Sequence, residues 1–291
     1  WGGLCSRSDK AALKLHFEPT SQYTQYSYAV RTLMVCMDDP SKKRVSSPIS
    51  TGNEGVFFEQ HVAAYWLAQL LVRSIPPILT DRVVTKVYFQ TEHLGFNTDD
   101  FLIVCARAGA PTARLVGQVK RSFTISAVND ECEKAIGDFW KDFKKADPFN
   151  PEHDRIVLVT LRGTNTLLDN FVGLLDCARG AADGEDFQRR LSLDGFISKR
   201  SVDQCNQICR IVSALEETCI TAKDLWPFLR VLHVLSLDLH TSTRQTEAHI
   251  KTLLALKMTD SDPAASADAA WDALLTFASK VGPAARSLKR A

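Results

Sequence analysis

The stretch DDFLIVCARAGAPTARLVGQVK, residues 99–120, decides the fold of this chain. Its first part, FLIVCA (101–106), is a continuous apolar run whose residue types favour a strand. A turn signal follows at Gly109-Ala110-Pro111, and ARLVGQVK (113–120) then resumes a strand-like pattern. Two such runs joined by a short turn-forming segment predict a β-hairpin.

The flanking sequence adds helices and strands to this hairpin. Residues 52–55 break the chain, and an apolar stripe from Val56 to Arg73 then predicts a helix. VVTKVYFQ (83–90) has the composition of a strand, a helix is expected from Glu131 to Phe143, and IVLVTL (156–161) is typical of a buried central strand. This order predicts a mixed sheet flanked by helices.

Beyond residue 165 the pattern is helical. Helices are expected over the ranges 167–178, 186–193, 201–215, 222–239, 243–256 and 268–279, with a Ser/Asp/Ala-rich link at 260–267. We therefore predict an α/β fold, a mixed sheet flanked by helices, with a C-terminal helical extension. A wholly helical scaffold with an incidental small sheet is the alternative, and the β-rich runs before residue 165 argue against it.

Composition sets broad bounds on function. The net charge of the 291 residues is +1, which neither supports nor excludes binding to nucleic acid, because a nuclease cleft needs only a local basic stripe. The eight cysteines are scattered without a CxxC pair, so free thiols in a reducing cytoplasm are expected rather than a zinc site. No apolar run reaches the roughly 18 residues that span a bilayer. A cytoplasmic protein without a membrane partner is expected.

The chain divides into three parts by pattern. Residues 1–50 have little periodicity and are predicted to form an accessory, poorly ordered arm. Residues 51–165 hold the predicted sheet, and residues 166–291 form the helical extension. The chain does not begin with Met and ends in a basic run without a closing element. We interpret both ends as cuts in a longer protein, with further domains expected downstream; a gene start read from the wrong place is the alternative.

Polar side chains gather at one end of the hairpin. Asp99 and Asp100 directly precede the first strand, and Gln118-Val119-Lys120 ends the second. Alternate residues of a strand share a face, so Gln118 and Lys120 point the same way, and pairing the strands brings the Asp end of one near the Lys end of the other. An acid, an amide oxygen and an ammonium are therefore expected at one edge of the sheet.

This set suits metal-dependent phosphodiester hydrolysis. Mg²⁺, or Mn²⁺ in its place, prefers oxygen ligands, which Asp100, Gln118 and the backbone carbonyl of Val119 offer, with Glu59 on the preceding helix as a further carboxylate. Asp99 replaces Asp100 if the strand register shifts by one residue. Lys120 is expected to position the attacking water and to offset negative charge.

Each residue also has a structural explanation. Asp99 and Asp100 are common turn residues before a strand. Lys120 and Arg121 fit a solvated strand end, and Glu59 fits a helix surface. Gln118 is harder to explain in this way, because a polar residue within an apolar strand needs a partner when it is buried. No HExxH, GxSxG or P-loop motif offers a competing chemistry.

These motifs, in this order, resemble a known family. Glu59-Gln60 on a helix, Thr98 to Ile103, and Gln118 to Ser122 look like the core of PD-(D/E)xK, restriction-endonuclease-like nucleases. More narrowly, they resemble the double-stranded DNA endonuclease domain at the N-terminus of bacterial anti-phage effectors. That group includes CD-NTase-associated effectors and STAND-type NTPase defence proteins. The stretches 154–165, 226–239 and 243–256 resemble long multidomain proteins that carry this nuclease.

The resemblance implies a Mg²⁺- or Mn²⁺-dependent endodeoxyribonuclease that cuts double-stranded DNA. It places Asp100, Gln118, Lys120, Glu59 and Asp99 at the catalytic site. It also implies contacts with downstream domains of the whole protein, such as a STAND-type NTPase sensor, and assembly as a homo-oligomer. Gln118 departs from the usual acidic residue of the motif. A catalytically inactive nuclease-fold interaction module is therefore the alternative function.

Overall fold

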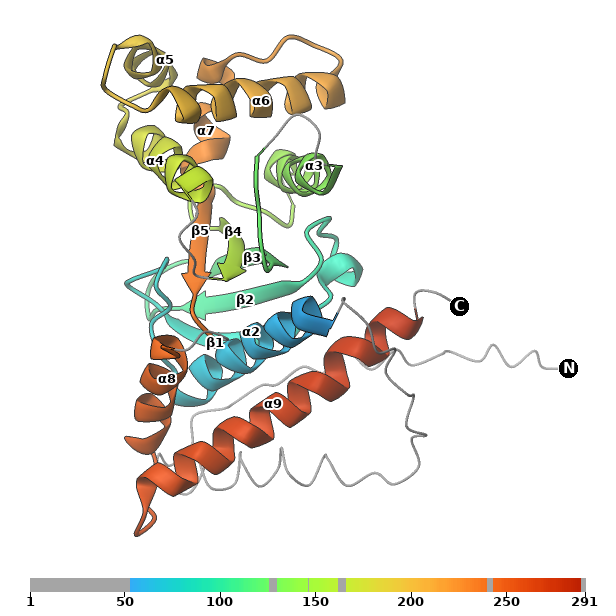
Figure 1. Ribbon diagram of the computed structural model, residues 1–291, viewed down its shortest axis with the longest axis vertical. Coiled ribbons are helices and arrows are strands. Elements are labelled where there is room, and N and C mark those ends of the chain that lie inside the picture. The colour runs from blue at the N-terminus through green and yellow to red at the C-terminus, as the bar shows by residue number, and fades with distance from the viewer. Residues whose placement is uncertain (1–52, 126–129, 146, 162–165, 240–242, 289–291) are drawn as a thin grey trace, which may run out of the picture.

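The computed structural model describes residues 53–125, 130–145, 147–161, 166–239 and 243–288 (Figure 1). The arm predicted for residues 1–50 lies outside the described residues. In chain order, the elements are α2 (Asn53–Val72), β1 (Val83–Phe89), η1 (Thr91–Leu94), β2 (Phe101–Ala106), β3 (Ala113–Lys120), α3 (Asp130–Lys144), β4 (Arg155–Leu161), α4 (Thr166–Gly180), α5 (Gly184–Ser192), α6 (Lys199–Glu216), α7 (Ala222–Val231), β5 (Leu232–Leu237), α8 (Gln245–Ala255) and α9 (Pro263–Leu288).

A five-stranded mixed sheet forms the centre of the fold, with the strands in sequence order from β1 to β5. β1, β2 and β3 pair antiparallel, whereas β3, β4 and β5 pair parallel. Helices cover both faces of the sheet. The α/β fold predicted from the sequence, a mixed sheet flanked by helices, is therefore confirmed.

The β2–β3 hairpin predicted from the sequence is present, and its register is that of an unbroken antiparallel ladder. Phe101 lies opposite Gly117, and the ladder runs to the pair Cys105–Ala113 near the turn. Gly109 in the turn has a φ of +73°, a backbone conformation that L side chains rarely adopt. Gly117 is needed for a different reason: a Cβ there would lie 1.9 Å from Cζ of Phe101. The aromatic ring of β2 thus lies directly over the backbone of β3.

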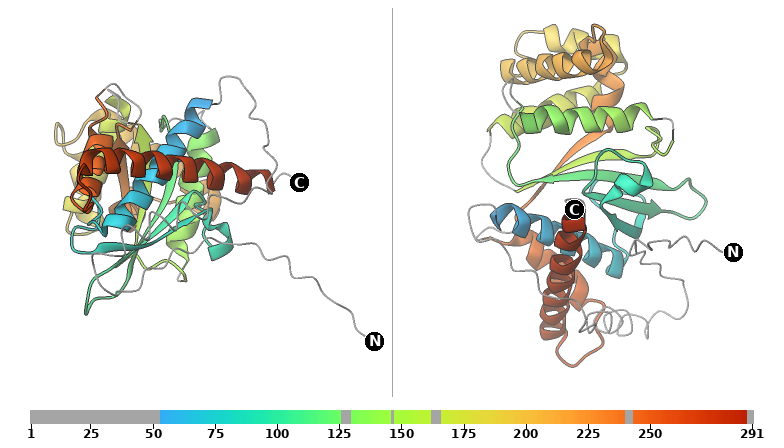
Figure 2. Two further views of the ribbon diagram at one scale, coloured as in Figure 1. Left: turned by 90° about the horizontal axis from the view of Figure 1, so that it is seen from below. Right: turned by 90° about the vertical axis from the view of Figure 1, so that its right-hand side faces the viewer.

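Two hydrophobic cores of the described residues lie on opposite faces of the sheet. Figure 2 shows the helices that cover each face. One face packs against α2, α8 and α9, and Trp66 of α2 stacks near Phe101 with ring centroids 5.5 Å apart. The other face packs against α3, α4, α6 and α7. Because α2 lies between the sheet and α9, its second half, residues 64–72, is buried on all sides, which explains the almost continuous apolar sequence there.

The helix predicted over residues 222–239 is wrong in its second half. α7 ends at Val231, and Leu232–Leu237 (LHVLSL) forms β5, which pairs with β4 from Ile156–Leu232 to Leu161–Leu237. A short apolar run of this kind suits a buried helix or a buried strand equally well, so its periodicity cannot decide between them. The tertiary structure favours the strand, because the edge of β4 would otherwise leave backbone groups without hydrogen-bond partners.

Two predicted breaks are also wrong, because helix-start signals resemble loop composition. α2 already begins at Asn53, within the expected break at 52–55. α9 begins at Pro263, within the expected link at 260–267. There Asp262 accepts a hydrogen bond from the Ala265 amide at 3.1 Å, and proline occupies the first helical position, where it lacks only a hydrogen bond that no helix makes.

The segment predicted as a helical extension is interleaved with the first part of the chain. α4 to α7 lie on one side of the sheet, β5 then completes the sheet, and α8 and α9 pack against α2 on the other side (Figure 1). Within the described ranges, none of the helices is both long and apolar enough to span a membrane.

Candidate functional site

Asp100 and Val119 meet at the open end of the β2–β3 hairpin. The Oδ2 atom of Asp100 accepts a hydrogen bond from the Val119 amide at 2.7 Å. The last residue pair of this ladder is Phe101–Gly117, so one further step places Asp100 opposite Gln118. The strand end predicted from the sequence therefore brings the aspartate onto the QVK segment.

Strand alternation decides which side chains share a face. Leu102 and Val116 belong to the core under α3 and α4, and the same parity puts Asp100, Gln118 and Lys120 on that face. Val119 belongs instead to the core under α2. The sheet thus brings an acid, an amide and an ammonium to one face, as the sequence predicts.

Gln118 is buried, with 6% of its surface exposed, and its Oε1 atom has no hydrogen-bond partner among the described residues. A buried amide oxygen without a partner costs about 1–3 kcal/mol, so the structure must have another use for it or lose stability. Five other buried side-chain atoms share this property, including Oγ1 of Thr98, two residues before Asp100. Gln118 is the one on the face of Asp100 and Lys120.

The backbone carbonyl of Val119 points toward the Asp100 side of β3. In a strand, the N–H and C=O of one residue point to the same side, and the Val119 amide already bonds to Asp100. Asp100, Gln118 and Val119 together offer a carboxylate, an amide oxygen and a carbonyl oxygen. These neutral and anionic oxygens fit a hard divalent cation that retains several waters.

The carboxylate content of this set is low. In the parts of the chain that the structure describes, no three His, Cys, Asp or Glu side chains come together in a way that could hold a metal ion. The fit to Mg²⁺ or Mn²⁺ therefore depends on the oxygens of Gln118 and Val119 as well as on Asp100.

Glu59 and Asp99 lie differently from the other predicted site residues. Glu59 is on α2, which packs against the opposite face of the sheet, although an ion pair between Glu54 and Arg121 ties the first turn of α2 to the end of β3. By strand alternation, Asp99 lies on the same face of the sheet as Phe101, which is the face covered by α2. Its carbonyl oxygen accepts a hydrogen bond from the Thr91 amide at 3.0 Å. Of the two aspartates, Asp100 is thus the one on the face of Gln118.

The structure adds polar residues that the sequence analysis did not single out. In the parallel ladders, Lys120 pairs with Thr160, and Thr160 pairs with Ser236, so a polar row continues across the ends of β3, β4 and β5. The hydroxyl oxygens of Thr160 and Ser236 are 3.4 Å apart. No local signal could reveal this row, because it depends on β5 being a strand.

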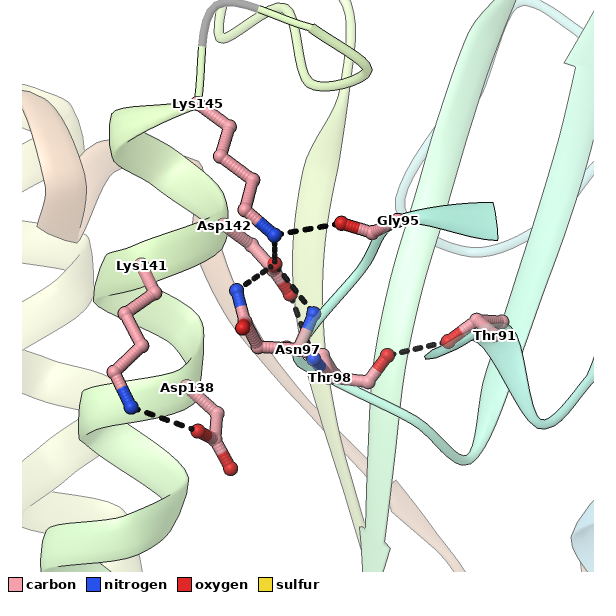
Figure 3. Close-up of polar contacts among 8 residues, drawn as sticks. All are labelled: Thr91, Gly95, Asn97, Thr98, Asp138, Lys141, Asp142 and Lys145. Atoms are coloured by element: carbon pink, nitrogen blue, oxygen red, sulfur yellow. Dashed lines mark hydrogen bonds and ion pairs between the residues drawn. The ribbon is translucent and has the colours of Figure 1, made fainter. Parts of the chain in front are cut away.

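A buried aspartate on α3 holds the loop that leads to Asp100. Asp142 has no exposed surface, and its carboxylate accepts hydrogen bonds from Asn97 and Thr98 (Figure 3). Within the sequence, Asp142 lies in a predicted helix about 45 positions from the loop. Only the tertiary packing of α3 against the sheet reveals its role.

Comparisons with known proteins give a weak structural likeness. No protein-family profile matches the chain, and no curated protein matches it. Among solved structures, it is similar to the Acinetobacter baumannii Cap4 SAVED/CARF-domain containing receptor with the cyclic trinucleotide 3'3'3'-cAAA, with a TM-score of 0.37 and 12% identity over 81% of this chain and 42% of that one. Another structure of the receptor gives a TM-score of 0.36 and 14% identity over 81% and 44%. The chain spans less than half the length of either receptor chain.

Proposed function

We propose that the chain carries a Mg²⁺- or Mn²⁺-dependent endonuclease domain that hydrolyses phosphodiester bonds of double-stranded DNA. The observation that supports this proposal is the buried Oε1 atom of Gln118, which has no partner among the described residues and shares a sheet face with Asp100 and Lys120. An oxygen in this state beside a carboxylate suits a cation better than it suits an apolar core.

Three groups of this chain would hold the cation: the carboxylate of Asp100, the amide oxygen of Gln118 and the carbonyl oxygen of Val119. Asp99 and Glu59 remain further candidates for this role. When bound, the cation supplies an acidified water and stabilises charge on the phosphate. The hydrogen bond from the Val119 amide fixes the orientation of the Asp100 carboxylate at the end of β3.

Lys120 lies where it could orient the attacking water and offset the negative charge that develops on the phosphate. It is the next residue after Gln118 on the same face, at the end of β3, and it is half-buried. A partly desolvated ammonium stabilises negative charge more strongly than one in bulk water. We assign Lys120 to orient the attacking water and to offset charge on the phosphate in the transition state.

The biological setting is proposed from the resemblance in the sequence. In that setting the domain is the effector of a bacterial anti-phage defence protein and works in the cytoplasm. Double-stranded DNA is its substrate. Downstream domains, such as a STAND-type NTPase sensor, and assembly into a homo-oligomer control its activity.

The second candidate function is a catalytically inactive module that kept the nuclease fold for protein interactions. Two observations favour it. Gln118 is neutral where an acid is usual, and the Asp100 carboxylate caps the end of the β2–β3 ladder by accepting the Val119 hydrogen bond. An aspartate in this position contributes to the hairpin even without a metal.

We expect the purified chain to cut plasmid DNA in Mg²⁺ or Mn²⁺ and not in EDTA. Lys120→Ala should lower the cleavage rate by about 100-fold or more, because it removes the group that orients the water. Lys86→Ala is the matched control, since Lys86 is a half-buried strand lysine on β1, separated from β3 by β2. Gel analysis of the plasmid forms measures all three proteins.

Wild-type cleavage by Lys120→Ala would contradict the mechanism. If the parent chain does not cut, a Mn²⁺ titration distinguishes the two functions. Binding that is lost in Asp100→Ala supports a nuclease site that awaits assembly with other domains. No Mn²⁺ binding supports the non-catalytic module.

A further inference from the structure

The loop before Asp100 is held by a buried charge. Oδ1 of Asp142 accepts hydrogen bonds from the backbone amide and the side-chain amide of Asn97, both at 2.7 Å, and Oδ2 accepts from the Thr98 amide at 2.7 Å (Figure 3). Lys145 lies 3.8 Å from Oδ1 and donates to the Gly95 carbonyl at 2.6 Å. One carboxylate of α3 thus binds two consecutive residues of the loop.

Burying the Asp142 carboxylate is unfavourable in free energy unless hydrogen bonds compensate for its lost hydration. An ionised carboxylate without solvent contact loses several kcal/mol of hydration, which only charge-assisted hydrogen bonds of good geometry offset. Three N–H donors at 2.7 Å provide that compensation here. These hydrogen bonds favour the observed loop conformation, because another conformation would leave the buried carboxylate without its donors.

The held residues lead directly into the candidate site. On the side away from Asp142, the hydroxyl of Thr91 donates to the Thr98 carbonyl, and the Thr91 amide donates to the Asp99 carbonyl at 3.0 Å. The Gln90 amide donates to the Asp100 carbonyl at 3.1 Å. Each residue from Asn97 to Asp100 therefore has a backbone hydrogen bond to a neighbouring element.

We propose that Asp142 is a positioning residue for the Asp100 site. By holding Asn97 and Thr98, it sets the backbone from which Asp100 reaches the Val119 amide and the space beside Gln118. The inference rests on the proposed metal-dependent function. The effect of Asp142 on the position of Asp100, however, can be measured without DNA cleavage. Positioning groups outside the ligand set commonly control metal affinity in this way.

The test uses Asp142→Asn, which keeps the side-chain shape but removes the charge and replaces one acceptor oxygen by a donor. Asp138→Asn is the matched control, because Asp138 lies one turn earlier on α3 and pairs with Lys141 at 3.5 Å, not with the loop (Figure 3). Asn97→Ala removes only one of the three donors to Asp142, so it is a milder variant that should fold if Asp142→Asn does not.

Two quantities are measured on each folded protein: the Mn²⁺ dissociation constant by calorimetry and the hydrogen-exchange rate of the Val119 amide. We expect Asp142→Asn to weaken Mn²⁺ binding by about 10-fold or more and Asn97→Ala to weaken it less. Exchange at Val119 should be faster in both, since its amide depends on Asp100. Asp138→Asn should match the parent chain in both measurements.

The positioning role is overturned if Asp142→Asn and Asn97→Ala leave the exchange rate of the Val119 amide unchanged. It is also overturned if the parent chain binds Mn²⁺ and Asp142→Asn binds it equally well. If the parent chain binds no Mn²⁺, the proposed metal function fails on its own. Exchange at Val119 then decides alone whether Asp142 positions Asp100.

Discussion

At the scale of single residues, Gln118 is the feature that most needs an explanation. This neutral amide lies in the stretch 115–119 of β3, which is otherwise apolar. It is almost fully buried, and its oxygen has no partner among the described residues. In the nuclease family that the sequence resembles, the corresponding position usually carries an acid. In the proposed metal site, the negative charge that would attract a cation comes mainly from Asp100, so we expect the metal affinity to be modest.

An acidic side chain at position 118 should therefore strengthen metal binding at the proposed site. We expect Gln118→Glu to lower the Mn²⁺ dissociation constant by about tenfold, which corresponds to ~1.4 kcal/mol, because a second carboxylate joins the oxygen set. Gln69→Glu is the control, since Gln69 is also buried with an unpartnered Oε1 atom, but lies on α2. Calorimetric titration measures both variants. Equal Mn²⁺ affinity of Gln118→Glu and the parent would remove Gln118 from the metal site.

At the scale of elements, the β2–β3 hairpin depends on one close approach. Phe101 lies over Gly117 and also contacts Trp66 of α2. This ring, on the residue that follows Asp100, therefore connects α2 with β2 and β3. Any side chain at position 117 must displace this ring.

Gly117→Ala should destabilise the fold by about 1–3 kcal/mol, because its Cβ has no space beside Phe101. Gly173→Ala is the control: Gly173 lies within α4, and a Cβ there meets nothing within 4 Å. That substitution should be neutral or stabilise the protein by up to ~1 kcal/mol. Urea unfolding followed by circular dichroism gives both values. A Gly117→Ala protein as stable as the parent would show that the ring can move without cost.

At the scale of the whole molecule, β5 joins the two halves of the chain. It completes the sheet after four helices on one face and directs the chain to α8 and α9 on the other (Figure 1). β5 also carries the half-buried His233, whose buried Nε2 atom has no partner among the described residues. Burial, followed by the charges of Arg179 and Arg155, lowers the pKa of His233 to about 3.

This pKa makes global stability depend on pH. An unfolded histidine binds a proton below pH ~6.5, whereas folded His233 stays neutral until much lower pH, so stability from this group is present above that value and is lost as the pH falls. Between pH 7.5 and 4.5, we expect the parent to lose about 2 kcal/mol more of its unfolding free energy than His233→Leu does.

Urea unfolding of both proteins at the two pH values measures this difference, and exposed His249→Leu serves as the control that should behave like the parent. If His233→Leu and the parent lose the same stability on acidification, the histidine is protonated in the folded state. In that case β5 does not seal it from solvent.

The sequence by itself determined the parts of this protein that depend on local order. FLIVCA, the turn and ARLVGQVK specify the hairpin, because strand-forming residues and turn residues act on their nearest neighbours along the chain. Strand alternation also places Gln118 and Lys120 on one face independently of any tertiary contact, since that periodicity is a property of the backbone.

Only the tertiary structure decided the remainder. LHVLSL became a strand because β4 offered an unpaired edge. The register of two strands selected Asp100 over Asp99 for the face of Gln118. Asp142 reached Asn97 and Thr98 across 44 or 45 positions of sequence. Each outcome depends on a partner that is distant in the chain, and local propensity contains no information about such partners.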